Sequence, residues 1–273
     1  MKEPNFGEGQ LQQVVNTAFT QFAIENHRVY ACPIIPTTVA EYGLGWDTGF
    51  YFPWLGYAPL VTHKGCNFFI QYKHSILIEG SRGGQWSDWN EEYFRFKIPH
   101  TIKNGKNYVT DYHQFDLLKL LSENDCDVYY ATNHVTLRDD LFSEASLGVL
   151  LDNIPFLDVR GMTNRHYYAT FTKNSDHFYL HSDPVKIPRL SGTKALDSIV
   201  ERKETTLTQG NEQLLSCLEI LAEHDRSVLR YIEKYQHLEK IDFSAPEEFR
   251  TFAKFQFLRI VFRAVVGAIV YRI

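Results

Sequence analysis

Hydrophobic positions near the amino terminus recur every three or four residues, which is the spacing of one face of an α-helix. They are Leu11, Val14, Val15, Ala18, Phe19 and Phe22. They predict an amphipathic helix over residues 11–25. Short apolar runs at 48–52 and 67–73 favour strands. Helical spacing returns over 111–121, and the apolar run at 127–131 predicts a buried strand. This order predicts an α/β fold, with a central mixed sheet flanked by helices.

The middle of the chain is rich in strand and turn patterns. Residues 93–98 alternate between apolar and polar, and the dipeptide Asn104-Gly105 predicts a hairpin turn beyond them. Two further strands are expected at 166–171 and 177–181, joined by a short polar turn. The central part of the chain is therefore expected to contain more strand than helix.

A polar stretch punctuated by glycine and proline covers residues 186–210 and marks the expected boundary in the chain. We expect an α/β domain over residues 1–190 and a linker over residues 191–210. A helical carboxy-terminal segment is expected over residues 211–273.

The carboxy-terminal segment contains two expected helices. The first is predicted over 214–232, and the Ser-Ala-Pro-Glu sequence at 244–247 is typical of a capping box that opens the second. The second has an apolar stripe from Phe255 to Ile269, and residues 249–273 contain five basic and no acidic residues. Such a helix can dock on its own domain or on a second copy, or bind anionic lipid or nucleic acid. These helices are therefore a candidate interface for a homodimer or a partner protein.

Composition places the chain among globular proteins with a sizeable core. Of 273 residues, 44% are hydrophobic and 15% are aromatic, which suits one large domain. The net charge of −5 argues against a strongly basic surface that binds nucleic acid nonspecifically, but it is compatible with a locally basic cleft.

The four cysteines form no C-x-x-C pair, which favours reduced thiols. No apolar leader and no apolar segment of ~20 residues is present, so we expect a cytoplasmic protein without a membrane span.

The side chains that carry candidate chemistry lie around the two early strand patterns. Asp47 immediately precedes the first run, after a glycine-punctuated segment that begins at Glu41. Gln71 and Lys73 lie two residues apart in the second run, so they share one face of a strand. If the two strands pair, one edge collects an acid, an amide and an ammonium group. Such groups suit metal-assisted phosphodiester cleavage, because oxygens hold a divalent cation and the ammonium orients the attacking water.

This arrangement resembles the PD-(D/E)xK, or restriction-endonuclease-like, nuclease superfamily. That family has the order helix, strand, acid-bearing strand, acid-x-Lys strand, helix, strand, and the resemblance covers about the first half of the chain. It implies that Asp47 binds the metal and that Lys73 is the catalytic lysine. Gln71 stands where the family more often has Asp or Glu, which removes one negative charge from the site. Glu25 or Glu41 would supply the additional glutamate that some members use.

The resemblance implies an endonuclease that uses Mg²⁺ or Mn²⁺ to hydrolyse phosphodiester bonds in DNA. A relative that has lost catalysis and works as a binding or assembly module is an alternative, which the glutamine at Gln71 keeps open. RNA cleavage is a further alternative. An intracellular nuclease with no visible specificity domain would endanger its host. An activating signal or a partner is therefore expected, as in prokaryotic defence systems against phage.

Three other constellations favour structural roles. His63 and Cys66 have the spacing of half a zinc site, but no second pair at ligand spacing accompanies them. The tripeptide His-Ser-Asp at 181–183 contains the residue types of a catalytic triad, yet adjacency in sequence does not give triad geometry. Trp86 and Trp89 have the chemistry to stack on bases, but anchoring their own loop is the favoured role.

Overall fold

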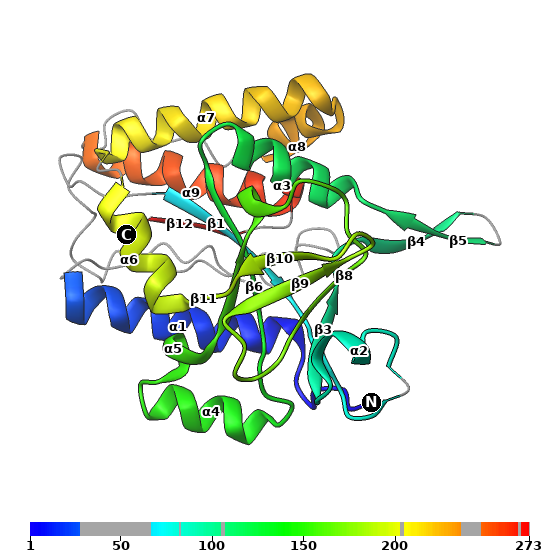
Figure 1. Cartoon of the computed structure of the whole chain (residues 1–273). Coiled ribbons are helices and arrows are strands. Elements are labelled where there is room, and N and C mark those ends of the chain that lie inside the picture. The colour runs from blue at the N-terminus through cyan, green and yellow to red at the C-terminus, as the bar shows by residue number, and fades with distance from the viewer. Residues whose placement is uncertain are drawn as a thin grey trace.

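The computed structural model describes residues 1–27, 67–81, 83–104, 107–202, 205–235, 247–266 and 269–272. It is a mixed α/β structure in which helices cover both sides of a central sheet (Figure 1). Asp47, Glu41, His63 and Cys66 lie outside the described residues, as does the whole 48–52 run. The strand pairing expected for that run therefore stays a prediction.

The central sheet has the strand order β11-β7-β6-β1-β12. Its strands are β1 (Asn67–Lys73), β6 (Asp127–Thr132), β7 (Pro155–Asp158), β11 (Leu190–Ser191) and β12 (Ile269–Arg272). β1 runs parallel to β6, with Lys73 opposite Thr132. On its other edge β1 pairs antiparallel with β12, from Asn67 to Ile70. β1 is therefore an internal strand, and it is buried along its whole length.

One side of the central sheet packs against four helices. These are α1 (Glu8–His27), α4 (Arg138–Ser146), α5 (Leu150–Asn153) and α6 (Gly192–Arg202). The ring centroids of Phe19 in α1 and Phe68 in β1 lie 6.1 Å apart. The Tyr72 hydroxyl donates to Asn16 Oδ1 at 3.2 Å. Because the later helix residue meets the earlier strand residue, α1 runs opposite to β1. Its first turn thus lies toward the carboxyl end of the strand.

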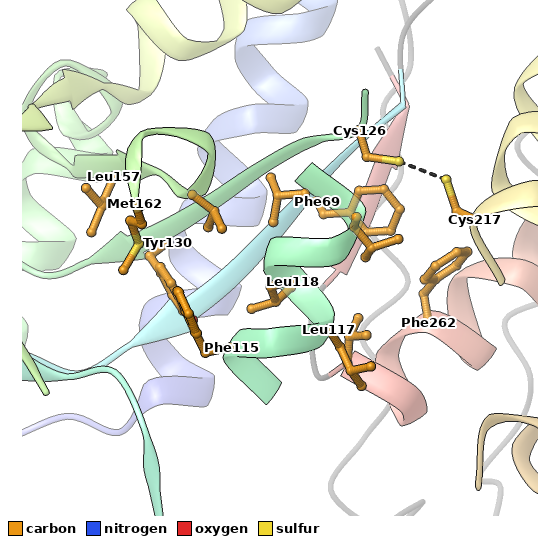
Figure 2. Packing of buried hydrophobic residues seen from close by; sticks show 14 of the residues in the cluster. Phe69, Phe115, Leu117, Leu118, Cys126, Tyr130, Leu157, Met162, Cys217 and Phe262 are labelled. Carbon is orange, nitrogen blue, oxygen red and sulfur yellow. Dashed lines mark hydrogen bonds between the residues drawn. The ribbon is translucent and has the colours of Figure 1, made fainter. Parts of the chain in front are cut away.

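The opposite side of the sheet packs against the carboxy-terminal helices and one earlier helix. These are α3 (His113–Glu123), α7 (Leu207–His224), α8 (Ser227–Tyr235) and α9 (Glu247–Val266). Phe69 of β1 meets Phe262 of α9 with ring centroids 4.9 Å apart. Leu118 of α3 belongs to the same buried cluster (Figure 2). The carboxy-terminal helices therefore share one hydrophobic core with the sheet.

A second, antiparallel sheet has the order β10-β9-β8-β3-β2, and β4 pairs with β5 in a separate ribbon. The elements of this region are β2 (Ile76–Ile78), α2 (Trp86–Trp89), β3 (Tyr93–Lys97), β4 (His100–Asn104), β5 (Asn107–Asp111), the 3₁₀ helix η2 (Val159–Gly161), β8 (Tyr168–Phe171), β9 (His177–His181) and β10 (Val185–Pro188). The β4–β5 ribbon projects away from the body of the molecule (Figure 1). Its base leads directly into α3, which places His100 close to the central sheet.

The tryptophan-containing segment is anchored to the second sheet, as the favoured interpretation predicts. Trp89 Nε1 donates to Thr170 Oγ1 at 2.9 Å, and the indole stacks on His177 with ring centroids 5.2 Å apart. His181, the first residue of the triad-like tripeptide, contacts the same Thr170 Oγ1 at 2.8 Å. This histidine is therefore part of the polar packing around β8 and β9.

Most elements predicted from local patterning are present within a few residues of their expected bounds. They are α1, β1, β3, the β4–β5 ribbon, α3, β6, β8 and β9. Residues 191–210 differ from the expected linker, because α6 occupies Gly192–Arg202. Leu196 and Ile199 of α6 are buried against the central sheet, which holds this segment as a helix. The helix predicted over 214–232 is divided into α7 and α8.

The last helix ends earlier than its apolar stripe predicts. α9 ends at Val266, and Ile269 begins β12, which pairs with β1. Phe255, Leu258 and Phe262 of the stripe are buried in the protein's own core. These side chains therefore do not form the surface expected for a homodimer. No helix among the described residues is long and apolar enough to cross a membrane.

Candidate functional site

Four polar side chains meet at the carboxyl end of β1, and we call them the β1 polar cluster. They are Gln71 and Lys73 of β1, His100 of β4 and Gln114 of α3. Gln71 is 3% exposed and Lys73 is 6% exposed. Both follow Phe69 on the face that packs against α3, because alternate strand residues point to the same side. The cluster therefore interrupts an otherwise apolar face of the central sheet.

Gln114 joins the members of the β1 polar cluster through both ends of its amide. Its Oε1 accepts from Lys73 Nζ at 3.1 Å and lies 2.6 Å from His100 Nε2. Its Nε2 donates to Gln71 Oε1 at 3.2 Å and to the carbonyl oxygen of Val266 at 3.0 Å. Because the Val266 carbonyl only accepts, this contact fixes the orientation of the amide. The amide oxygen also only accepts, so His100 Nε2 carries a hydrogen and donates to it.

Lys73 is a buried cation without an ion-pair partner among the described residues. Desolvation lowers the pKa of its ammonium group from 10.5 to about 8, and the charge of Glu8 partly opposes this shift. The ammonium lies 5.9 Å from the centroid of the Tyr130 ring. Burying a charge is costly unless a counter-charge or hydrogen bonds offset the lost hydration. The arrangement is therefore suited to receive an anionic group beside Lys73.

His100 gives the β1 polar cluster a link to solvent, since this residue as a whole is exposed. Desolvation of its ring against the cluster lowers the pKa of the imidazole, and the charge of Lys73 lowers it further. Hydrogen bonding to Gln114 and the charge of Asp111 act in the opposite direction. The net shift favours a neutral imidazole, which leaves Lys73 as the main positive charge of the cluster.

The ring of Tyr130 lies next to the cluster, and its hydroxyl has no hydrogen-bond partner among the described residues. It lies opposite Gln71 in the β1–β6 pairing and is 1% exposed. Its hydroxyl is buried, and burial strongly raises the pKa of the phenol. Buried hydroxyls usually have a partner, so this group is available to a molecule bound beside the cluster.

The position of the cluster in the sheet suits ligand binding. In open α/β sheets, ligands bind outside the carboxyl ends of parallel strands. Lys73 is the last residue of β1 and lies opposite Thr132, the last residue of β6. Asn133 holds the two strand ends together, because its Oδ1 accepts from Ser75 N at 2.8 Å and its Nδ2 donates to Ser75 O at 3.0 Å.

The structure brings together only some of the site residues predicted from the sequence. Gln71 and Lys73 share a face, as the strand period predicts, and both contact Gln114. Glu25 does not join them. It lies seventeen residues beyond Glu8 in α1, about 25 Å along the helix axis, on the end directed away from Lys73. Glu25 Oε1 instead accepts from the side-chain amide of Gln21, at 3.0 Å. No cluster of metal-binding side chains surrounds this glutamate among the described residues.

Sequence reasoning missed three residues that bear on this site. Gln114 and His100 reach Lys73 across separations of 41 and 27 residues, and Glu8 acts on it through charge. The position of Gln114 in the first turn of a helix is the only local signal that it faces the sheet, since Leu117 and Leu118 follow at helical spacing. No local signal marks His100 or Glu8, because their proximity depends on the tertiary fold.

Comparisons with protein-family models, with curated proteins and with solved structures found no match to this chain.

Proposed function

We propose that this chain is a metal-dependent endonuclease that hydrolyses phosphodiester bonds in DNA, with its reaction centre at the β1 polar cluster. The observation that carries the proposal is Lys73, a buried ammonium group that forms no ion pair with a carboxylate at contact distance among the described residues. It lies beside Gln71 on β1, and β2, α2 and β3–β5 separate this strand from α3 and from the parallel strand β6. A strand with Gln71 and Lys73 on one face, with a helix and a further strand later in the chain, supports the resemblance to PD-(D/E)xK nucleases. The acid-bearing strand of that family stays a prediction.

The described residues supply only part of what a divalent cation needs. Gln71 offers an amide oxygen, a type of ligand that Mg²⁺ and Mn²⁺ accept. No group of three or more His, Cys, Asp or Glu side chains that could hold a metal occurs in the described part of the chain. The negative charge of the site therefore comes, in this proposal, from Asp47 and from Glu41. When bound, the ion would polarise the phosphodiester and lower the pKa of a water molecule.

The chain's own residues have separate tasks in this proposal. Lys73, in its protonated form, orients the attacking water and offsets the charge that develops on the phosphate. Gln114 holds the ammonium group in place through the hydrogen bond of 3.1 Å. Neutral His100 closes the outer side of the cluster and donates to the same amide oxygen. The rate of cleavage should fall above pH about 8, where Lys73 loses its proton.

A binding or assembly module without catalysis is the second candidate, and one observation favours it. Both ends of the Gln71 amide are already engaged, because Oε1 accepts from Gln114 and Nε2 donates to the Tyr72 carbonyl at 2.9 Å. A ligand role for Gln71 would require one of these hydrogen bonds to break. In such a module the same cluster would bind an anionic partner through Lys73. RNA, in place of DNA, is the alternative substrate of the active form.

The carboxy-terminal helices leave only part of their surface for a homodimer or a partner protein. Because the apolar stripe of α9 is buried, a homodimer or partner would have to use other side chains of the carboxy-terminal helices. Leu229 of α8 is one such residue, with 48% of its surface exposed. An activating signal or partner, as in prokaryotic defence, remains part of the proposal because an unrestrained nuclease would damage the host genome.

The proposal is tested by incubating the protein with plasmid DNA and with a structured RNA, each with Mg²⁺ or Mn²⁺. Wild type should cleave DNA, and Asp47→Ala should abolish cleavage because the metal loses its carboxylate. Gln71→Glu should tighten metal binding and keep or raise activity, because it adds a negative charge to the site. Equal cleavage by wild type and Asp47→Ala would contradict the site. If wild type and Gln71→Glu bind DNA but neither cleaves it with either metal, the binding module is favoured.

A further inference from the structure

A pair of buried thiols joins the central sheet to the carboxy-terminal helices. Cys126 immediately precedes β6, and Cys217 lies in α7. Their sulfur atoms are 2.8 Å apart, and each residue is 3% exposed. Figure 2 shows the two side chains pointing at each other beside Phe69 and Phe262. These residues are 91 positions apart in the sequence, so only the fold brings them together.

We infer that Cys126 and Cys217 form a reversible disulfide, which makes this pair a site of oxidative modification. The fold already brings the two sulfur atoms to within 2.8 Å of each other, against about 2.05 Å in a disulfide bond. A hydrogen bond from Cys126 lowers the pKa of the Cys217 thiol, against the opposing effect of burial. A lower pKa favours the thiolate of Cys217, which is the form that attacks an oxidant.

Hydrogen peroxide is the oxidant that this inference names. The Cys217 thiolate attacks one peroxide oxygen, the O–O bond breaks, and a sulfenic acid and water result once a proton is taken up. The Cys126 sulfur then attacks the sulfenic sulfur, the S–O bond breaks, and a second water leaves as the disulfide forms. The two sulfurs together lose two electrons and the peroxide gains them. A dithiol reverses the reaction by exchange.

The bond would fasten α7 to the sheet at a distance from the β1 polar cluster. Cys126 lies before Asp127, which pairs with Phe68 at the amino end of β1. Lys73 is five residues further along that strand, about 17 Å away. The disulfide is therefore independent of the proposed nuclease activity. Its expected effect is on the stability of the packing between α7 and the sheet.

The test uses the full chain, treated with hydrogen peroxide and then alkylated under denaturing conditions. Peptide mapping should show a peptide pair joined through Cys126 and Cys217, with a mass two hydrogen atoms lower than that of the reduced pair. A dithiol should remove the link. Oxidation should raise the Tm by several degrees, about 5–10 °C, because a cross-link over a long loop limits the unfolded chain.

A double variant provides the matched background. Cys32→Ser with Cys66→Ser leaves only the inferred pair, and it should give the same linked peptide and the same rise in Tm. Adding Cys217→Ala should abolish both. The inference is overturned if both thiols remain open to alkylation after peroxide treatment of wild type. It is also overturned if the only cross-links formed involve Cys32 or Cys66, or if peroxide gives only sulfinic acid.

Discussion

The two ends of the β1–β6 strand pair are built from different kinds of residue. At the amino end, Phe69 packs on Phe262 at 4.9 Å, next to the buried thiols of Cys126 and Cys217. At the carboxyl end, the same face of the sheet carries the β1 polar cluster, with Lys73 buried among hydrogen-bonding amides. The amino end gains free energy from apolar burial, whereas the carboxyl end holds a cation at a cost.

This difference separates the part of the sheet that stabilises the fold from the part that is available for chemistry. A sequence that only had to fold would gain from an apolar residue at Lys73, because burying a charge without a counter-charge at contact distance is costly. Local departures from good packing are expected at functional sites, where other parts of the protein compensate for them. Substitutions at the two ends should therefore differ in their effect on stability, and the largest effect is expected at the apolar amino end.

Phe69→Ala should destabilise the protein by about 3–5 kcal/mol, because it removes a ring from the closely packed core and leaves a cavity. Phe69 is 1% exposed and meets α9 through Phe262. Chemical denaturation of wild type and variant measures the difference. The matched control is Phe142→Ala in α4, where the ring is 41% exposed and the loss should be much smaller. Similar losses of unfolding free energy in both variants would contradict the claim that packing at the amino end of the strand pair stabilises the fold.

Lys73→Met should remove a dependence of stability on pH. The pKa of Lys73 is about 8 in the folded chain, against 10.5 ordinarily. Between these values the unfolded chain binds a proton that the folded chain does not, so stability rises as the pH rises from about 8 to 10.5. The gain of wild type relative to Lys73→Met over this window should reach about 3 kcal/mol.

The measurement is the free energy of unfolding of both proteins at several pH values. Taking the difference between wild type and Lys73→Met at each pH cancels the titration of the groups that the two proteins share. Lys173→Met, at an exposed turn position, is the matched control and should track wild type. A constant difference between wild type and Lys73→Met across this range would contradict a buried cation at the carboxyl end.

The sequence predicts the elements of the amino-terminal half better than it predicts the site. Period-two alternation was enough to place Gln71 and Lys73 on one face, and helical spacing was enough to find α1 and α3. β12 was missed because Ile269 continues the 3–4 spacing of the preceding helix, although it pairs with β1. Its strand conformation is set by that pairing, which local spacing does not encode.

The partners of Lys73 could not be predicted for the same reason. Gln114 and His100 are ordinary polar residues in their local sequence, and only the packing of α3 and of the β4–β5 ribbon brings them to β1. The resemblance to nucleases supplied Asp47 as a further candidate, and this residue lies outside the described part of the chain. The structure thus gives the positions of Lys73 and its partners, whereas the position of Asp47 stays a prediction.

Gln114→Leu should cost about 1–3 kcal/mol of stability, because it leaves buried polar groups without partners. Gln71 Oε1 and the Val266 carbonyl would each lose a hydrogen bond from the amide. Lys73 would lose an acceptor as well, so its pKa should fall further below about 8. Denaturation measures the first effect, and NMR titration of the lysine side chain measures the second. Gln21→Leu, on the exposed surface of α1, is the control. A stability loss equal to that of the control would mean that the cluster is not connected through Gln114.

Tyr130→Phe should have the smallest effect on stability, within about 0.5 kcal/mol, since the hydroxyl that it removes makes no hydrogen bond with the part of the chain that the structure describes. Its effect on function should be larger if the hydroxyl contacts a bound ligand, and DNA binding or cleavage would then weaken. Denaturation and a binding titration on the same sample separate the two. A large loss of stability would show that the hydroxyl has a structural partner and would remove it from the proposed site.

The central claim is that Lys73 at the carboxyl end of β1 serves the hydrolysis of phosphodiester bonds. Single-turnover cleavage of DNA by wild type, Lys73→Ala and the surface control Lys173→Ala tests it most directly, with any required partner present. We predict that Lys73→Ala lowers the cleavage rate by about 100-fold or more while DNA and metal binding persist, because the lysine acts mainly in the transition state. Lys173→Ala should cleave like wild type. Equal cleavage rates for wild type and a folded Lys73→Ala variant would contradict the claim.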